Sequence, residues 1–476
     1  MPAKWGEITA GEILLPIRGE LVSGSGETFL TGLCIDSREI KPGQLFWAIE
    51  GERFDGHDFI EKAIENGASG IVMKKGHHRE RTPGKTPSIM VVTDTLKALG
   101  DLAGWWRQKH PIPVVAITGS VGKTTTKEMT AGILGMGAKT LKNKGSFNNL
   151  VGLPLTLFLL EDKHQRVVLE LGMNKPGEIA GLTMISDPNI GVITNVKKVH
   201  LEGVGDIMGV ARAKVELLEK MSPKALPILN GDDALLMSVA TDLRSDAVIY
   251  GLGPDNEIRA EKIRNLGRDG VTFELRFHGR AVSVRLRVPG VQNVVNALAA
   301  CAVAICLKEP LEHIVEGLNR FKSLKGRLKM VPLSSGATLV DDTYNSNPSS
   351  LKAAIDSIKA LASDRSKVIV GLGEMLELGE ESQTAHIDAG RLVAELEARY
   401  FFALGDHAKE MVKGAVEAGF PPGRSQVVDT HGEMEKGIKE MVRSGDLVLL
   451  KGSRGIGLEV VAEGLKRDCP KEDNDG

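Results

Sequence analysis

Residues 114–134 read VVAITGSVGKTTTKEMTAGIL, in which an apolar strand pattern, a glycine turn and a helix-forming run follow one another directly. This order is typical of a phosphate-binding loop, because the amides at the start of the helix point toward an anion held in the turn. Gly119 and Gly122 let the backbone approach that anion closely. Lys123 is placed to neutralise phosphate charge, and Thr124 to offer a hydroxyl to magnesium.

One position of this loop departs from the usual pattern GxxxxGK[ST]. Ile117 stands five residues before Gly122, where the pattern has a glycine. A glycine turn followed by a lysine, without any nucleotide, therefore stays open as an alternative when this stretch is taken alone.

The sequence on either side of the loop predicts three α/β domains, which agrees with a length of 476 residues at roughly 150 residues per domain. Residues 1–110 contain short mixed segments and end at the proline-containing HPIP of residues 110–113, a predicted linker to the next domain. Residues 111–325 predict a central parallel sheet with helices on both faces, extended by an antiparallel hairpin around His278 and Gly279. Residues 326–476 repeat the strand and helix alternation and predict a Rossmann-like domain.

Bulk composition argues against nucleic acid or a membrane as the partner. The 60 basic and 62 acidic residues leave a net charge of -2, so any phosphate site must be local. No apolar stretch approaches the roughly 18 residues of a membrane span, and the first residues lack a secretory pattern, so we expect a cytoplasmic protein. The four cysteines, Cys34, Cys301, Cys306 and Cys469, are too few and too scattered for a disulfide framework. Cys301 and Cys306 lie in the apolar run ALAACAVAICL and are expected in the core.

The loop resembles the ATP loop of the Mur ligases, a family in which the loop has this shortened form. Further stretches that resemble the family follow in chain order: LELGMNKPGEIA (169–180), TNVKKVHLEGVGDIMGVARAKVELL (194–218), LNGDD (229–233), VPGVQNVVNALAA (288–300), GRLKM (326–330) and LLKGSR (449–454). The resemblance implies a three-domain enzyme that uses ATP to join a carboxylate to an amine through an acyl phosphate.

Four stretches are similar to the members of the family that add D-alanyl-D-alanine to UDP-N-acetylmuramoyl-tripeptide. They are IDSREIKPGQLFWAIEGERFDGHDF (35–59), NKGSFNNLVGLPLTL (143–157), DDTYNSNPSS (341–350) and VGLGEMLELGEES (370–382). A DNPR-like motif, usual in the members that add diaminopimelate, does not occur in the third domain. The resemblance therefore implies these two substrates and a chain that acts as a monomer.

The family resemblance also implies two magnesium ions near the loop. Glu170 at the end of RVVLE, with Thr124, corresponds to the ligands of the first ion. His200 and Lys214 correspond to those of the second, with Lys214 converted by carbon dioxide into a carbamate, an anionic oxygen ligand that suits a hard cation. Without the motif around them, a solvated strand-end glutamate, an exposed histidine and a surface lysine are the plainer interpretations.

Residues for ATP are expected from the loop, from one helix start and from the third domain. Asn293 and Asn296 lie one helical turn apart, and the resemblance places Asn293 on adenine, although an asparagine there also serves as a helix cap. The predicted ATP-binding residues are Gly119, Ser120, Val121, Gly122, Lys123, Thr124, Thr125, Asn293, Arg327, Asp342 and Tyr344. The predicted catalytic residues are Lys123, Lys214, His200 and Arg327.

Substrate contacts are expected in all three domains. The first domain would hold the UDP end of the acceptor through Ser37, Arg38, Arg53, Asp55 and His57. Asn148 and Asn149 correspond to contacts with the muramoyl-peptide. In the third domain, the substrate contacts are expected from Asn345, Asn347, Lys451 and Ser453. The dipeptide is expected near Asn345 and Asn347. The base that deprotonates the dipeptide amine is not identifiable from the sequence.

Three other functions are alternatives to this one. A Mur-type or folylpolyglutamate-type ligase for another amino acid is the alternative within the same class. A regulatory GTPase is disfavoured, because no NKxD guanine motif occurs and NKPG at 174–177 matches it only in part. A sugar-nucleotide binder without catalysis is opposed by the joint presence of Lys123, Thr124, Glu170, His200 and Lys214.

Overall fold

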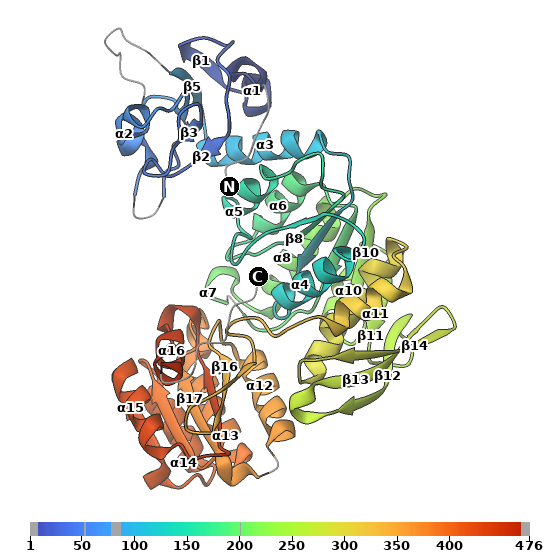
Figure 1. The fold of residues 1–476 in the computed structure, drawn as a ribbon, viewed down its shortest axis with the longest axis vertical. Helices are drawn as coiled ribbons and strands as arrows, with labels where there is room; N and C mark the ends of the chain where they lie inside the picture. Colours follow the sequence, from blue (N-terminus) through green and yellow to red (C-terminus); the bar gives the residue numbers. More distant parts are fainter. Residues whose placement is uncertain (1–7, 52–53, 78–86, 200, 363, 468–476) are drawn as a thin grey trace.

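The computed structural model describes residues 8–51, 54–77, 87–199, 201–362 and 364–467. The chain forms three units in sequence order, from the blue first unit to the orange and red third unit at the opposite end (Figure 1). Each unit contains one sheet, of five, nine and six strands in turn. The expected α/β fold with three sheets is confirmed, whereas the exact domain boundaries at 110 and 325 stay predictions.

The first sheet is small and mixed. Its strands are β1 (Glu20–Ser23), β2 (Leu33–Cys34), β3 (Leu45–Trp47), β4 (Gly70–Lys74) and β5 (Ser88–Val92). They lie in the order β1-β5-β4-β3-β2, with β1 antiparallel to β5 and the other pairs parallel. The helices of this unit are α1 (Ala10–Ile17), α2 (Ile60–Glu65) and α3 (Thr95–Gln108), preceded at α2 by the 3-10 turn η1 (Gly56–Phe59).

Helix α3 joins the first unit to the middle unit. It packs against α1 on one side and against α5 and α6 of the middle unit on the other, and it lies between the two units in Figure 1. Near its end, the buried Arg107 donates from Nε to the carbonyl of Ser186 and from Nη2 to that of Asp187, each at 3.1 Å. The predicted linker at 110–113 therefore follows a helix that both units share.

The middle unit has a nine-stranded sheet with a parallel centre. Its strands are β6 (Val114–Thr118), β7 (Thr140–Lys142), β8 (Arg166–Glu170), β9 (Ile190–Ile193), β10 (Leu226–Asn230), β11 (Val248–Gly251), β12 (Ile258–Asn265), β13 (Val271–Phe277) and β14 (Arg280–Leu286). The strand order is β14-β13-β12-β11-β10-β9-β6-β8-β7. Its helices are α4 (Lys123–Leu134), α5 (Gly152–Leu157), α6 (Glu178–Ser186), α7 (Leu201–Val204), α8 (Ile207–Lys220), α9 (Ala234–Ala240), α10 (Val291–Cys306) and α11 (Leu311–Asn319).

Strand β6 is buried on both faces. Val114 and Ala116 belong to the core shared with α6 and α8, whereas Val115 and Ile117 belong to the core under α4 and α10. Alternate side chains of a strand point to opposite faces, so a strand covered on both sides must be apolar throughout. Because β6 pairs in parallel with β8 and β9, the residues that follow these three strands meet at one edge of the sheet.

The predicted hairpin is found, whereas of the two cysteines expected in the core Cys301 is buried and Cys306 is only partly buried. Strands β13 and β14 are antiparallel, with Phe277 opposite Arg280 across a two-residue turn. His278 and Gly279 in that turn have φ values of 44° and 73°, as a type I′ turn requires. Cys301 is buried within α10.

The third unit has a parallel sheet with one antiparallel edge strand. Its strands are β15 (Lys329–Pro332), β16 (Thr338–Asp342), β17 (Val368–Gly373), β18 (Tyr400–Leu404), β19 (Ser425–Val428) and β20 (Leu447–Lys451), in the order β15-β16-β20-β17-β18-β19. Its helices are α12 (Pro348–Leu361), α13 (Ser382–Leu396), α14 (Ala408–Glu417), α15 (His431–Met441) and α16 (Glu459–Lys466). Single 3-10 turns elsewhere are η2 (Gly267–Asp269), η3 (Arg365–Lys367), η4 (Gly379–Glu381), η5 (Pro422–Arg424) and η6 (Arg454–Ile456).

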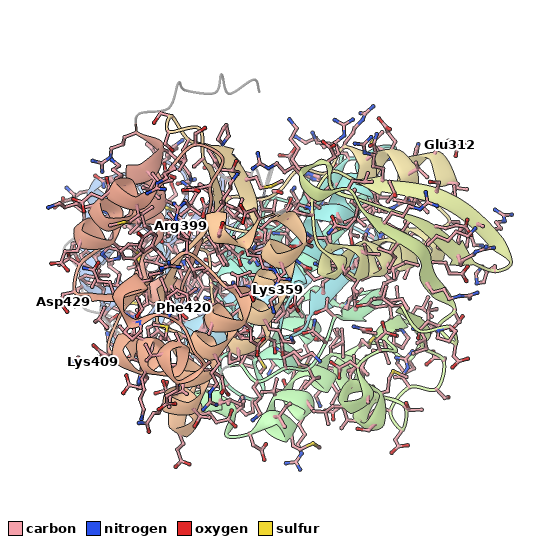
Figure 2. All side chains as sticks on the ribbon, turned by 90° about the horizontal axis from the view of Figure 1, so that it is seen from below. Glu312, Lys359, Arg399, Lys409, Phe420 and Asp429 are labelled. Carbon is pink, nitrogen blue, oxygen red and sulfur yellow. The ribbon has the colours of Figure 1, made fainter. Side chains whose placement is uncertain are left out.

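Hydrogen bonds between described residues connect the third unit to the middle one. Arg327 donates to Thr124 at 2.8 Å, and Gln292 donates to Ser357 at the same distance. Lys198 donates to the carboxylate of Glu381 at 2.7 Å. Seen from the third-domain end, Arg399 and Phe420 of the third unit lie on the opposite side of the molecule from Glu312 of α11 (Figure 2). None of the described helices combines the length and hydropathy that a membrane span requires.

Candidate active site

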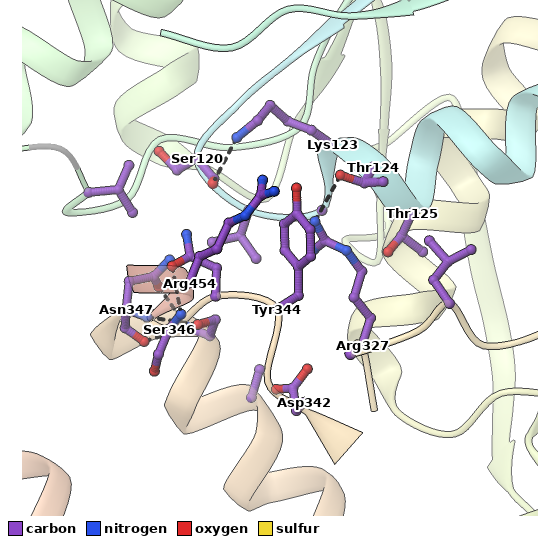
Figure 3. Close-up of a pocket in the computed structure, with 18 of the residues that line it drawn as sticks. Ser120, Lys123, Thr124, Thr125, Arg327, Asp342, Tyr344, Ser346, Asn347 and Arg454 are labelled. Carbon is purple, nitrogen blue, oxygen red and sulfur yellow. Dashed lines mark hydrogen bonds between the residues drawn. The ribbon is translucent and has the colours of Figure 1, made fainter. Parts of the chain in front are cut away.

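A cavity of about 720 Å³ lies between the middle and third units. Residues after β6 and β8 line it from the middle unit, and residues after β16 and β20 line it from the third. Figure 3 shows Ser120, Lys123 and Thr124 of the middle unit opposite Arg327, Tyr344 and Arg454 of the third. Most of the predicted site residues line this cavity: Ser120, Val121, Gly122, Lys123, Thr124, Thr125, Asn148, Asn149, Glu170, Asn293, Arg327, Asp342, Tyr344, Asn345, Asn347, Lys451 and Ser453. Residues far apart in the sequence thus share one space.

The loop after β6 has a backbone that only glycine fits at two positions. At Gly119, with φ of +141°, an added Cβ would lie 2.0 Å from the hydroxyl oxygen of Thr194. At Gly122, with φ of +88°, it would lie 2.3 Å from Oδ1 of Asn296. Helix α4 starts at Lys123 without a side-chain cap on its amides, so these amides remain available to an anion in the cavity.

The segment after β9 holds this loop in place. Asn195 Oδ1 accepts from the amide of Val121, and Asn195 Nδ2 donates back to its carbonyl, both at 2.9 Å. Ser120 Oγ donates to the carbonyl of Lys197 at 3.1 Å and accepts from its amide at 2.9 Å. The hydroxyl of Ser120 is therefore engaged within the protein, and its amide donates to the carbonyl of Asn195.

Lys123 lies across the loop that precedes it. Its ammonium donates to the carbonyls of Gly119 at 2.8 Å and Ser120 at 3.3 Å. Burial lowers the pKa of Lys123, the carboxylate of Glu170 opposes this, and Arg327 adds to the lowering. A bound phosphate would supply the anionic partner that this lysine lacks.

Glu170 presents an unpaired carboxylate oxygen to the loop. Its side chain is buried, and Oε1 accepts from Asn148 Nδ2 at 2.9 Å. Oε2 is also buried and has no hydrogen-bond partner. A buried carboxylate oxygen without a partner is costly, so a hard cation such as Mg²⁺ fits here, with Thr124 as the neighbouring hydroxyl ligand.

Asn143 fixes the backbone of Glu170. Asn143 Oδ1 accepts from the amide of Glu170 at 2.9 Å, and Asn143 Nδ2 donates to its carbonyl at 3.0 Å. The fully buried Lys127 donates in turn to the carbonyl of Asn143 at 2.7 Å. This network aims the glutamate at the cavity.

The third-unit wall is built around a buried ion pair. Lys451 donates to Asp342 Oδ2 at 2.6 Å and to the carbonyl of Asn345 at 2.9 Å, while the amide of Leu328 donates to Asp342 Oδ1. Burial raises the pKa of Asp342 although Lys451 opposes this. The guanidinium of Arg327 lies 4.2 Å from the ring centroid of Tyr344.

Family models match all three units. They are "Mur ligase family, catalytic domain" over residues 30–106, "Mur ligase middle domain" over 117–304 and "Mur ligase, glutamate ligase domain" over 326–454. The chain belongs to the Mur ligase family.

Three relatives illustrate the similarity of this chain to known proteins in sequence and in structure. A UDP-N-acetylmuramoyl-tripeptide–D-alanyl-D-alanine ligase of Bacillus subtilis is 32% identical over 96% of this chain and 98% of its own length. The crystal structure of MurF from Acinetobacter baumannii has a TM-score of 0.88 and 31% identity, covering 98% of this chain and all of that one. A MurF ligase of Thermotoga maritima in complex with ADP has a TM-score of 0.81 at 26% identity, covering 92% and 97%.

Of the two residues predicted to bind a second metal ion, Lys214 and His200, the structure describes only Lys214. Lys214 is almost fully buried in α8, and no hydrogen bond from its ammonium to a described residue is present. Burial lowers the pKa of Lys214 well below its ordinary value, Lys123 adds to this, and Glu216, Glu170 and Glu178 oppose it. Lys214 therefore lies within electrostatic range of Lys123 and Glu170, although it is not one of the cavity-lining residues. His200 lies outside the described residues.

The described members of the predicted first-domain set do not line this cavity. Asp55 accepts from both the amide and Nδ1 of His57, and His57 Nε2 accepts from the amide of Lys74. Ser37 is buried, and the exposed Arg38 pairs with its neighbour Asp36. The first unit lies at the end of the molecule away from the third (Figure 1). Arg53 lies outside the described residues.

Several predicted binding residues also make hydrogen bonds that stabilise the local backbone. Asn347 caps α12 through a capping box with Ser350. Asn149 Oδ1 accepts from the amides of Val151 and Gly152. Asn293 Nδ2 donates to the carbonyl of Pro289 at 2.7 Å, while the side chain of Asn293 still borders the cavity.

Asn143, Asn195 and Arg454 were not among the predicted site residues. Asn195 is the second residue after β9, the strand next to β6, and Arg454 directly follows the predicted Ser453, so the places of both residues marked them as candidates. Asn143 carried none beyond the start of a family-like stretch, because its role depends on the contact with Glu170.

Proposed function

We propose that this chain is an ATP-dependent ligase that adds D-alanyl-D-alanine to UDP-N-acetylmuramoyl-tripeptide. The observation that carries this proposal is the cavity in which Lys123 and Glu170 face Arg327 and Lys451. The names of its full-length relatives support the choice of substrates. The ADP in the Thermotoga maritima structure supports the choice of nucleotide.

The reaction would proceed in two steps within this cavity. A carboxylate oxygen of the tripeptide attacks the γ-phosphorus of ATP, and the bond from that phosphorus to the bridging oxygen breaks to release ADP. The dipeptide amine then attacks the acyl carbon, phosphate leaves, and the amine loses a proton.

Positive charge is required for the first step. Two unit negative charges about 4 Å apart repel by about 4 kcal/mol at an effective dielectric of about 20. Lys123 and the free amides of α4 offset this on one wall, and Arg327 offsets it on the other. Mg²⁺ held by Glu170 and Thr124 would neutralise further phosphate charge.

The remaining nucleotide contacts follow from the cavity lining. The loop from Gly119 to Thr125 would bind the phosphates, Asn293 the adenine, and Asp342 and Tyr344 the ribose side. Asn148 and Asn149 would meet the peptide acceptor beside Glu170, and Asn345 and Asn347 the dipeptide.

A carbamate on Lys214 and a second Mg²⁺ form part of this proposal. The support is the burial of Lys214 and its lowered pKa, because only the neutral amine attacks carbon dioxide to form a carbamate. His200 would be the protein ligand beside it. The carbamate would place an anionic oxygen near Glu170.

The first domain would bind the UDP end through Ser37, Arg38, Arg53, Asp55 and His57. In this proposal residues 1–110 form the UDP-substrate-binding domain and residues 111–325 the ATP-binding domain. Residues 326–476 form the domain that closes over ATP and binds the dipeptide. We also propose that the chain acts as a monomer, since both walls of the cavity come from one chain. The cytoplasmic location stays a prediction.

The test is phosphate release measured with UDP-N-acetylmuramoyl-tripeptide, ATP and a panel of acceptors. We expect release with D-alanyl-D-alanine and little with single amino acids. Release with a single amino acid, and none with the dipeptide, would favour the alternative of another Mur-type or folylpolyglutamate-type ligase.

A further inference from the structure

Four cationic side chains line the cavity among the described residues, and three of them are already engaged. Lys123 donates to two carbonyls of its own loop. Arg327 donates to Thr124, and Lys451 is paired with Asp342. The fourth is Arg454, in the turn η6 that follows β20.

Arg454 lines the cavity, and its positive charge has no anionic partner among the described residues. Its side chain is exposed, and its guanidinium makes no ion pair or hydrogen bond with any described residue. The guanidinium carbon lies 5.5 Å from the ring centroid of Tyr344. Figure 3 shows Tyr344 between Arg327 and Arg454, with Arg454 directed toward the loop of Ser120.

An apolar surface adjoins this arginine. Leu376 lines the cavity with 39% of its surface exposed. A Cβ built on Gly455 would lie 2.7 Å from Leu376 Cδ1, so this methyl group touches the backbone next to Arg454. The side chain of Leu376 therefore lies next to the turn that carries Arg454.

Ser453 keeps the two groups together. Its hydroxyl accepts from the amide of Leu376 at 2.9 Å and donates to the carbonyl of Ser346 at 3.2 Å. Its amide donates to the carbonyl of Glu374 at 3.0 Å. The buried Ser453 thus ties the segment of Leu376 to the turn of Arg454, and its hydroxyl has little capacity left for a substrate.

The dipeptide carries a carboxylate that takes no part in the reaction. Its amine must reach the acyl carbon near Lys123, but its carboxylate, up to about 7 Å away in an extended dipeptide, stays anionic. Burying a carboxylate without a partner is costly, and the planar fork of arginine matches both of its oxygens. The methyl group of the last residue requires an apolar contact beside it.

We infer that Arg454 binds the free carboxylate of the incoming dipeptide and that Leu376 contacts its carboxyl-terminal methyl group. Together they form the subsite that selects an acceptor with a free carboxylate and a small last residue. This inference rests on the proposed function and adds to it the residues that recognise the far end of the acceptor.

The test compares D-alanyl-D-alanine with D-alanyl-D-alaninamide in the wild type and in Arg454→Gln. We expect the substitution to raise the KM for the acid about tenfold or more, because a charge-assisted hydrogen bond is lost. The KM values for the amide, for ATP and for the UDP-substrate should change less than about threefold by the same reasoning. Arg424→Gln, an exposed arginine in the turn η5 of the same unit, is the matched control and should leave every constant unchanged.

Several results would overturn the inference. Equal losses for acid and amide would mean that Arg454 does not act on the carboxylate, and a raised KM for ATP alone would assign it to the phosphates. The wild-type enzyme alone gives a second test. Equal KM values of the wild type for D-alanyl-D-alanine and for D-alanyl-D-alaninamide would also reject the subsite. Failure of the proposed function is a separate result: no phosphate release from the wild type with either acceptor.

A second variant tests the apolar half of the subsite. Leu376→Ala should reduce the preference for D-alanyl-D-alanine over D-alanyl-D-leucine about fivefold or more, since removing the side chain makes room for a larger residue. An unchanged preference would exclude Leu376 from the contact.

Discussion

Arg327 Nη2 donates a hydrogen bond to Thr124 Oγ1 at 2.8 Å, between residues 203 positions apart in the chain. The same guanidinium lies over the ring of Tyr344. The third domain therefore already contacts the start of α4. The hydroxyl that we assign to Mg²⁺ is held by an arginine that we assign to the phosphates, so both groups lie where the γ-phosphate would bind.

Arg327→Ala should lower kcat about 100-fold or more, because a cation on the third-domain wall would no longer stabilise the transferring phosphate. The measurement is steady-state phosphate release with both substrates saturating. Arg320→Ala is the control, since Arg320 is an exposed residue that pairs with Glu316 on the helix before it. A kcat within threefold of the wild type would remove Arg327 from the phosphate site.

Lys123→Ala should abolish ligation and leave binding of the UDP-substrate largely intact, because the first domain does not share the cavity of Lys123. Calorimetric titration of UDP-N-acetylmuramoyl-tripeptide measures the binding, and phosphate release measures the reaction. Equal loss of both would contradict the proposed division of work between the domains.

Asn143→Ala should reduce stability by about 2 kcal/mol, since it leaves the buried amide and carbonyl of Glu170 without partners. It should also raise the Mg²⁺ concentration needed for activity, because the glutamate is no longer held in place. Denaturant unfolding and a magnesium titration of phosphate release measure the two effects. Asn265→Ala, where an exposed asparagine only accepts from the amide of Gly267, is the control with little change expected in either.

Stability should fall as the pH drops below about 6.5, and His386 should contribute to this slope. Burial lowers the pKa of His386 below its ordinary 6.5; the contact with Ser382 opposes this. The unfolded chain then binds more protons than the folded one, so protons favour unfolding in this range. His386→Gln, which keeps an acceptor for the amide of Met375, should give a flatter dependence of the unfolding midpoint on pH between about 7 and 5. An unchanged slope would exclude His386 as the titrating group.

Lys214 should form a carbamate with carbon dioxide. Incubation of the protein with ¹³C-bicarbonate should give a carbamate resonance that is absent from Lys214→Arg, because arginine stays protonated. Activity should fall in buffer depleted of carbon dioxide and return on addition of bicarbonate. Full activity of Lys214→Arg would show that the carbamate is not needed.

Much of this site could be predicted from short stretches of sequence. The order of strand, glycine turn and helix in residues 114–134 predicted the loop, because backbone conformation and helix dipole depend on neighbouring residues. Asn293 and Asn296 could be paired from their spacing alone, since residues three apart share a helix face. The cap formed by Asn347 and Ser350 was also readable, as an asparagine before Pro-Ser-Ser, although it was interpreted only as a substrate contact.

Packing brings these local pieces together. The strands, the glycine loop and the residue types of a phosphate and metal site could be predicted locally, since they depend on periodicity and on local backbone geometry. Only the folded chain placed β8 and β9 on either side of β6, buried Lys214 within electrostatic range of Lys123, and turned Asn143 toward Glu170. It alone also left Arg454 unpaired at the cavity, because whether a charge has a partner depends on residues brought close by packing and not by sequence.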